Sequence, residues 1–129
     1  MKKKILIVSA RYYDDFSNYL ELSTVSYLKK KTKYKIINVP GVFEIPVVIS
    51  KNIKKYDGFI ALGCVIKGET PHFEFISQAT TNAIMQLSID YKKPIGNGII
   101  TSLNKYQASI RSKKKGEEAA KAIINVLSI

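Results

Sequence analysis

Apolar and polar positions follow one another in blocks that predict strands and helices in turn. Short, mostly apolar runs rich in β-branched residues predict buried strands. Longer stretches with apolar residues three or four positions apart predict amphipathic helices. We expect strands at 4–10, 35–39, 58–64 and 95–100, and helices from 14 or 15 to about 29–33, at 45–53, at 72–91 and at 104–128, the last with a break near Gly116.

The ends of the first two helices carry local signals. Asp14 or Asp15 is expected to cap the first helix, because a carboxylate accepts hydrogen bonds from free backbone N–H groups. The lysine run that follows suits the negative end of the helix dipole. Pro46 falls near the start of the second helix, where proline is tolerated. The apolar positions of the first helix are Phe16, Leu20, Val25 and Leu28.

Strict alternation of strands and helices predicts the α/β class. Parallel strands need right-handed crossovers, so helices cover both faces of the sheet. We therefore predict a three-layer α/β/α sandwich with a four-stranded parallel sheet, formed by a single domain over residues 1–129. Ligands of such sheets bind beyond the carboxyl ends of the strands. Candidate chemistry is therefore sought in the turns that follow each strand.

Composition excludes several classes of protein. A hydrophobic content of 46% and a charged content of 24% are typical of a globular chain and not of a disordered one. The longest uncharged apolar run, 58–66, is far shorter than the roughly 20 residues of a membrane span. The basic start and apolar run imitate a secretion signal, but the run stops at Arg11, so we interpret it as the first strand.

The chain has too few cysteines and histidines for an internal disulfide or a typical zinc site. A lone Cys64 forms no internal disulfide, which is typical of a reducing compartment, so we expect a cytoplasmic protein. Together with His72, the lone histidine, it does not supply the usual ligand set of zinc, and we predict no metal.

The net charge of +11 has three interpretations: ordinary surface charge, a nucleic-acid partner, or an anionic small molecule. The lysines stand in short scattered groups, and no nucleic-acid-binding motif accompanies them. We therefore favour surface charge and expect no nucleic-acid partner. Only Arg11 and Arg111 are arginines. A guanidinium grips carboxylate or phosphate through two bonds, which marks both as candidates.

The turn after the third strand, 63–72 (GCVIKGETPH), leads a glycine loop into a helix. Backbone N–H groups at such a helix start attract anions, and Thr70 adds a hydroxyl. His72 at the helix entrance suits proton transfer near neutral pH, although a capping or surface role fits equally well from chemistry alone.

The turn at 39–46 (VPGVFEIP) also permits two interpretations. It is either a rigid turn with Phe43 in the core and Glu44 at a helix start, or a wall whose polar groups bind the hydroxyls of a polyol. No GxGxxG motif follows the first strand and no Walker motif occurs, which disfavours a dinucleotide or nucleoside triphosphate enzyme.

The segments PGVFEIP and GCVIKGETPHFEFI together resemble the lumazine synthase family of riboflavin biosynthesis. The resemblance continues through PIGNGIIT, Gln107-Ala108, Arg111 and Lys115-Gly116, and it spans nearly the whole chain. Members join 5-amino-6-(D-ribitylamino)uracil to 3,4-dihydroxy-2-butanone 4-phosphate, giving 6,7-dimethyl-8-ribityllumazine, phosphate and water. The resemblance therefore implies a flavodoxin-like transferase with two small-molecule substrates and no cofactor.

The resemblance also implies a role for each candidate residue. His72 carries protons and Arg111 grips the phosphate across a subunit interface, and both are catalytic by this correspondence. Phosphate binding is further implied for Gly68, Glu69 and Thr70. Binding of the pyrimidine and the ribityl chain is implied for Tyr12, Val42, Phe43, Glu44, Val65, Ile66, Asn97 and Lys115.

The chain departs from the family pattern in three places. Asn97 stands where many members have an aromatic residue, Tyr13 stands where an asparagine is common, and the segment 111–115 is shorter than in many members. The family forms pentamers, some of which build larger assemblies, and the shortened segment favours a free pentamer. Two alternatives stay open: a catalytically silent flavin or lumazine carrier, and a basic nucleic-acid-binding module.

Overall fold

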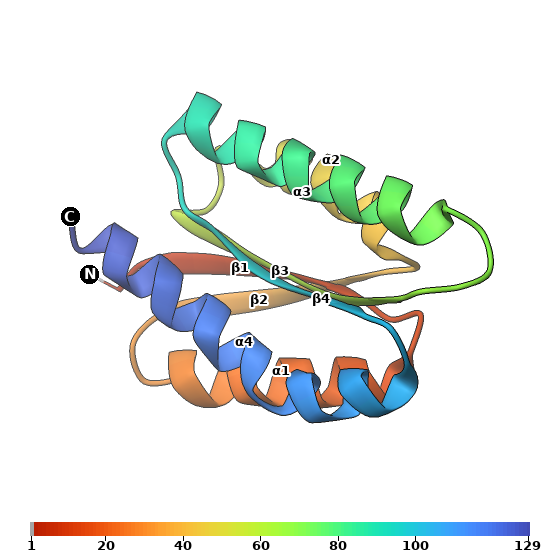
Figure 1. Cartoon of the computed structure of the whole chain (residues 1–129). Coiled ribbons are helices and arrows are strands. Elements are labelled where there is room, and N and C mark those ends of the chain that lie inside the picture. Colours follow the sequence, from red (N-terminus) through yellow and green to blue (C-terminus); the bar gives the residue numbers. More distant parts are fainter. Residues whose placement is uncertain (1) are drawn as a thin grey trace.

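The computed structural model describes residues 2–129 and contains a four-stranded sheet, all parallel, in the order β2-β1-β3-β4. The strands are β1 (Lys4–Ala10), β2 (Lys33–Val39), β3 (Gly58–Ile66) and β4 (Ile95–Ser102). The helices are α1 (Asp14–Leu28), the 3-10 helix η1 (Val42–Glu44), α2 (Ile45–Asn52), α3 (His72–Tyr91) and α4 (Lys105–Leu127). Figure 1 shows α2 and α3 over one face and α1 and α4 over the other. The predicted three-layer α/β/α sandwich, flavodoxin-like in type, is confirmed.

The core consists of two apolar layers, one on each face of the sheet. Alternate residues of a strand point to opposite faces, so β1 supplies both layers. Ile5 and Ile7 belong to the layer under α1 and α4, whereas Leu6 and Val8 belong to the layer under α2 and α3. All four are fully buried. The apolar positions predicted for α1 pack against the first of these layers: Phe16, Leu20, Val25 and Leu28.

The structure corrects the ends of α1. Its N-cap residue is Tyr13, which makes no side-chain capping bond, so the predicted cap by Asp14 or Asp15 is wrong. Both carboxylates lie in the first turn instead, where they still interact favourably with the helix dipole. The helix ends at Leu28, before the lysine run.

Three of the four strands are longer than the hydrophobic pattern indicates, and only β1 has its predicted bounds. Strand β2 starts at Lys33 because its first residues already pair with β1. Strands β3 and β4 both continue two residues past their predicted ends, and Ile66 pairs there with Ser102. Backbone pairing with a neighbouring strand overrides the weak preference of lysine or serine for other structure.

Helix α4 is continuous from Lys105 to Leu127, so the predicted break near Gly116 is wrong. The helix starts with a capping bond, because Asn104 Oδ1 accepts from the backbone N–H of Gln107 at 2.9 Å. Gly116 is buried against α1, and a Cβ atom there would lie 2.3 Å from the carbonyl oxygen of Leu20. This glycine therefore lets two helices approach closely and does not end one.

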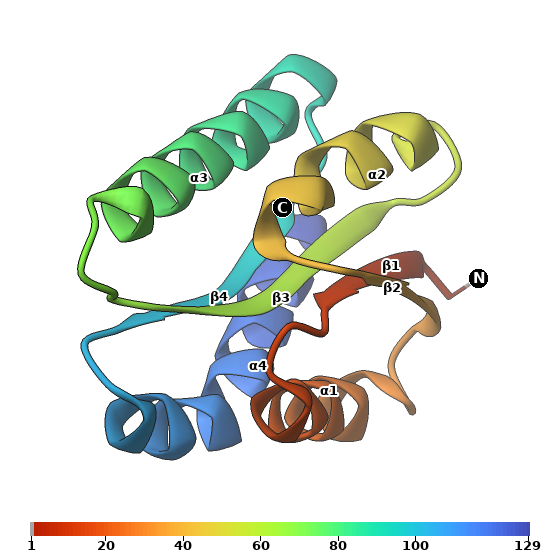
Figure 2. The ribbon, with the colours of Figure 1, turned by 90° about the vertical axis from the view of Figure 1, so that its right-hand side faces the viewer.

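The parallel topology gives the fold two different ends. The β1–α1 turn, η1, the β3–α3 loop and the β4–α4 connection gather at the carboxyl ends of the strands, on the right in Figure 1 and toward the viewer in Figure 2. The strands begin at the opposite end, where both chain termini lie (Figure 1). Across residues 2–129, no helix combines the length and the apolarity needed to cross a membrane.

Candidate functional site

A depression of about 510 Å³ at the carboxyl ends of β1 and β3 collects most of the predicted site residues. We refer to it as the site depression. It has the mixture of apolar walls and a few polar groups that is typical of a small-molecule site. The predicted residues that line it are Tyr12, Val42, Phe43, Glu44, Val65, Ile66, Gly68, Thr70 and His72.

Two aromatic rings of the site depression are left exposed. Tyr12 is 75% exposed and Phe43 is 62% exposed, so the interpretation of Phe43 as a core residue is wrong. The neighbouring Val42 fills the core instead and is 6% exposed. Rings held open to water at a concave surface gain free energy when a flat ligand covers them.

The wall formed by η1 is rigid because Glu44 locks it. Glu44 Oε1 accepts from the backbone N–H of Gly41 at 3.0 Å, and the N–H of Glu44 donates to the Gly41 carbonyl at 3.2 Å. Gly63 of β3 leaves room for this turn, since a Cβ there would lie 2.4 Å from a methyl group of Val42. The segment is thus both a rigid turn and part of the wall.

The loop before α3 forms the polar side of the site depression. The first turn of a helix has backbone N–H groups without partners inside the helix, and they attract an anion. Thr70 Oγ1 accepts from the backbone N–H of His72 at 3.4 Å, which holds the loop against this helix start. The side chain of His72 stands exposed at the entrance, whereas Glu69 is exposed and lies outside the lining.

Arg111 and Lys115 lie apart from the site depression within one chain. They line a second hollow of about 430 Å³ beside β4, which is an edge strand. Arg111 Nη1 donates to the carbonyl of Thr101 at 2.9 Å, and Lys115 Nζ lies 3.9 Å from a carboxylate oxygen of Glu118. We call this hollow the β4-edge depression. The two residues predicted to be catalytic, Arg111 and His72, therefore line different depressions.

Asn97 lies on β4 and lines neither depression. Its side-chain oxygen accepts from the backbone N–H of Ile99 at 3.0 Å, so the amide folds back onto its own strand. The exposed side chain thus stands on the same edge strand that flanks Arg111.

Two residues that the sequence marked only in passing also line the site depression: Tyr13 and Cys64. The Tyr13 ring makes an edge contact with Tyr12, with centroids 4.9 Å apart. Burial raises the pKa of Tyr13, and the neighbouring Tyr12 and Cys64 add to the effect. Only their position in the sequence could have indicated these two residues, because both lie near the carboxyl end of a predicted strand. Gly41, Phe73 and Ile76 complete the lining.

We expect Cys64 to resist alkylation at neutral pH. Burial raises the pKa of the thiol to about 11, against the opposing effect of a hydrogen bond with Ser102. Only the thiolate reacts, so at pH 8 the folded protein should react with iodoacetamide roughly 100-fold more slowly than the unfolded chain. The rate should rise with pH up to about 11. Equal rates with and without denaturant at pH 8 would contradict this environment.

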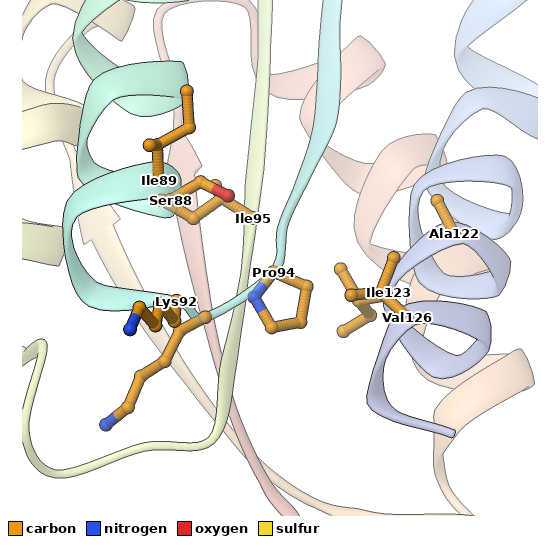
Figure 3. A pocket seen from close by; sticks show the side chains of 9 residues that line it. Ser88, Ile89, Lys92, Pro94, Ile95, Ala122, Ile123 and Val126 are labelled. Atoms are coloured by element: carbon orange, nitrogen blue, oxygen red, sulfur yellow. The ribbon is translucent and has the colours of Figure 1, made fainter. Parts of the chain in front are cut away.

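A further hollow of about 440 Å³ lies at the other end of the sheet, between α3 and α4 (Figure 3). Ile89, Pro94, Ile123 and Val126 line it with Lys92 and Lys93, and it contains none of the predicted site residues. In the part of the chain that the structure describes, no cluster of three or more His, Cys, Asp or Glu side chains could hold a metal ion.

Comparison with known proteins shows which family the chain belongs to. The family model of 6,7-dimethyl-8-ribityllumazine synthase matches residues 2–129. The chain belongs to the lumazine synthase family. The 6,7-dimethyl-8-ribityllumazine synthase of Bartonella henselae is 44% identical over 137 residues, covering 99% of this chain and 88% of that protein. The enzyme of the same name from Bartonella bacilliformis is 42% identical over 134 residues, covering 97% and 88%.

A solved structure adds support for the fold alone. The ABC domain in complex with L-Trp from Streptococcus pneumonia superposes with a TM-score of 0.51 at 16% identity, covering 98% of this chain and 41% of that one. Membership of the lumazine synthase family confirms the predicted transferase of riboflavin biosynthesis. It also implies small-molecule substrates and an oligomer.

Proposed function

We propose that this chain condenses 5-amino-6-(D-ribitylamino)uracil with 3,4-dihydroxy-2-butanone 4-phosphate to form 6,7-dimethyl-8-ribityllumazine. The observation that carries the proposal is the site depression, where exposed rings face the same hollow as an anion-binding helix start. One half suits a flat pyrimidine with a polyol chain, and the other suits a phosphate. The reaction itself uses no metal, organic cofactor, nucleic acid or membrane.

Each substrate has its own part of the site depression in this proposal. The Tyr12 ring stacks on the pyrimidine, while Val65 and Ile66 at the end of β3 line the ring pocket. The η1 wall of Val42, Phe43 and Glu44 holds the ribityl hydroxyls. Gly68, Glu69 and Thr70 surround the phosphate before α3, and Lys115 and Asn97 approach the ring from a neighbouring subunit.

The proposed reaction begins with formation of an imine, continues with loss of phosphate and ends with ring closure. The 5-amino group attacks the ketone carbon, and water leaves to give an imine. Loss of a carbon-bound proton expels the phosphate and leaves an enol. The enol becomes a ketone, the ribitylamino nitrogen attacks it, and a second water leaves as the ring closes. Holding two substrates in register contributes on the order of 7–11 kcal/mol to lowering such a barrier.

His72 and Arg111 supply the chemical assistance. An exposed imidazole at the entrance of the site depression can take and return the protons that every step moves, for about 10²–10⁴-fold in rate. The guanidinium of Arg111 and the loop N–H groups stabilise charge on the departing phosphate. Cys64 takes no part, because its raised pKa keeps it a thiol.

A complete site in this proposal needs two subunits. Arg111 stands beside the open edge of β4, in a different depression from His72, so a neighbour has to bring its own Arg111 to the site. We propose a free pentamer in the cytoplasm, with each chain a single domain over residues 1–129. The lone Cys64 supports a reducing compartment.

The function is tested by incubating the purified protein with both substrates. We expect a product with lumazine absorbance and one phosphate released per product, at a rate well above the uncatalysed background. Each substrate alone serves as the control. Tight binding of the product without turnover would support the silent carrier instead, and a rate equal to the background would defeat the enzyme proposal.

A further inference from the structure

The fold gathers lysines that are scattered in the sequence. All four strands start at the same end of a parallel sheet, and lysines occupy the segments that lead into each of them. We call this the basic end; it lies with both termini on the left of Figure 1. Thirteen of the nineteen lysines belong to it: residues 2–4, 29–31, 33, 35, 51, 54, 55, 92 and 93.

The basic end carries the entire net charge of the chain. Only Asp57 and Asp90 accompany its thirteen lysines, which leaves +11, while eight basic and eight acidic residues cancel elsewhere. Twelve of these lysines are exposed, and Lys93 is half-buried. In residues 2–129 the ion pairs within 4.0 Å involve Arg11, Lys115 and Lys121 instead. The positive potential is therefore concentrated and uncompensated at this end.

The surface of the basic end is hollowed between lysines and tyrosines. A depression of about 450 Å³ is lined by Lys4, Ile5, Lys33, Tyr34, Lys35, Lys55 and Tyr56. Lys33 and Lys35 stand two residues apart on the edge strand β2 and so project from the same face. Tyr34 is 41% exposed, and Tyr56 is half-buried with its ring 6.1 Å from that of Phe59.

We propose that the basic end binds single-stranded nucleic acid, a partner that the scattered sequence pattern had disfavoured. Lysines along a groove neutralise successive phosphates, and exposed tyrosine rings stack on bases without sequence preference. The two tyrosines favour this partner over an acidic peptide, which offers no bases. The hollow favours it over a membrane, which presents a broad flat surface.

This second surface is independent of lumazine formation. The site depression lies at the carboxyl ends of the strands, and the basic end lies where the strands begin. Because like charges repel, we do not expect the basic ends of two subunits to face each other in an oligomer. Loss of nucleic-acid binding and loss of lumazine formation can therefore be separated by experiment.

The test measures binding of a fluorescein-labelled oligouridylate by anisotropy from 50 to 200 mM salt. The affinity should fall steeply with salt, with a logarithmic slope of about −0.7 for each phosphate neutralised. Lys35→Gln/Lys55→Gln should reduce that slope by about 1.4 and weaken binding on the order of tenfold at 50 mM salt. Lumazine formation by this variant should equal that of the wild type.

A matched control replaces two lysines outside the basic end, in the part of the chain where basic and acidic residues cancel. Lys105→Gln/Lys113→Gln should leave binding within about twofold, because these lysines lie on α4 away from the hollow. Thermal melting of both variants checks that they fold. Equal losses from the two pairs of substitutions would mean that net charge alone attracts the oligonucleotide, which overturns the proposal.

The bases provide a second, separate readout. Tyr34→Leu should weaken oligouridylate binding about fivefold or more, while binding of inorganic polyphosphate, which has phosphates but no bases, stays unchanged. The proposal is overturned if the oligonucleotide does not bind at 50 mM salt. It is also overturned if polyphosphate, polyglutamate or anionic phospholipid vesicles bind as tightly as the oligonucleotide at equal salt, since each outcome assigns the surface to another partner.

Discussion

Replacing Gly116 by alanine is expected to lower the free energy of unfolding by about 1–3 kcal/mol. The added Cβ would lie 2.3 Å from the Leu20 carbonyl oxygen and 2.3 Å from Thr24 Oγ1. The first of these is backbone, so relief requires α1 and α4 to move apart. Alanine favours a helix over glycine by roughly 0.5–1 kcal/mol, which offsets only part of the loss. Urea unfolding followed by circular dichroism measures the difference.

The control for this substitution is Gly68→Ala. No atom lies within 4 Å of a Cβ built at Gly68, so its stability should stay within about 0.5 kcal/mol of the wild type. Two variants of equal stability would mean that α1 and α4 are not packed closely at Gly116. Arg111 and Lys115 lie on the same helix shortly before Gly116. A shift of α4 in the Gly116→Ala variant would therefore also displace these two predicted site residues.

Gly116 also illustrates what a hydrophobic pattern leaves out. Glycine weakens an isolated helix, so the sequence predicts a break there. Only the neighbouring helix reveals why glycine is present, and that neighbour is nearly a hundred residues away in the chain. By contrast, β1 and α3 have the predicted bounds, because a strong apolar run and a proline-glycine loop signal these elements locally.

The same holds for the site: local sequence signals predicted part of it, and the rest depends on contacts between distant segments. The turns after parallel strands were predictable as the place of the site, and nine predicted residues share one depression there. Arg111 was marked by composition and resemblance, yet no local signal indicates that it faces the outer edge of β4. The basic end likewise depends on topology, since its lysine groups meet only once the strands are parallel.

The largest expected change in activity comes from mixing two inactive variants. His72→Ala should slow lumazine formation by about 10²–10⁴-fold, and Arg111→Ala by a loss on the order of 10²–10³-fold. Each variant keeps the half of the site that the other lacks. When subunits are exchanged at equal amounts, roughly one interface in four should combine an intact His72 with an intact Arg111. About a quarter of the wild-type rate should then return.

In the control, subunits of His72→Ala are mixed with subunits of the double variant His72→Ala/Arg111→Ala. No interface then regains an imidazole, so no activity should return. Different affinity tags on the two partners, purified in sequence, show that subunits have mixed. If tagged mixed assemblies of the two single variants stay inactive, His72 and Arg111 do not complete each other across an interface. Recovery requires that one chain supplies the guanidinium and another the imidazole, because the two groups line separate depressions in each chain.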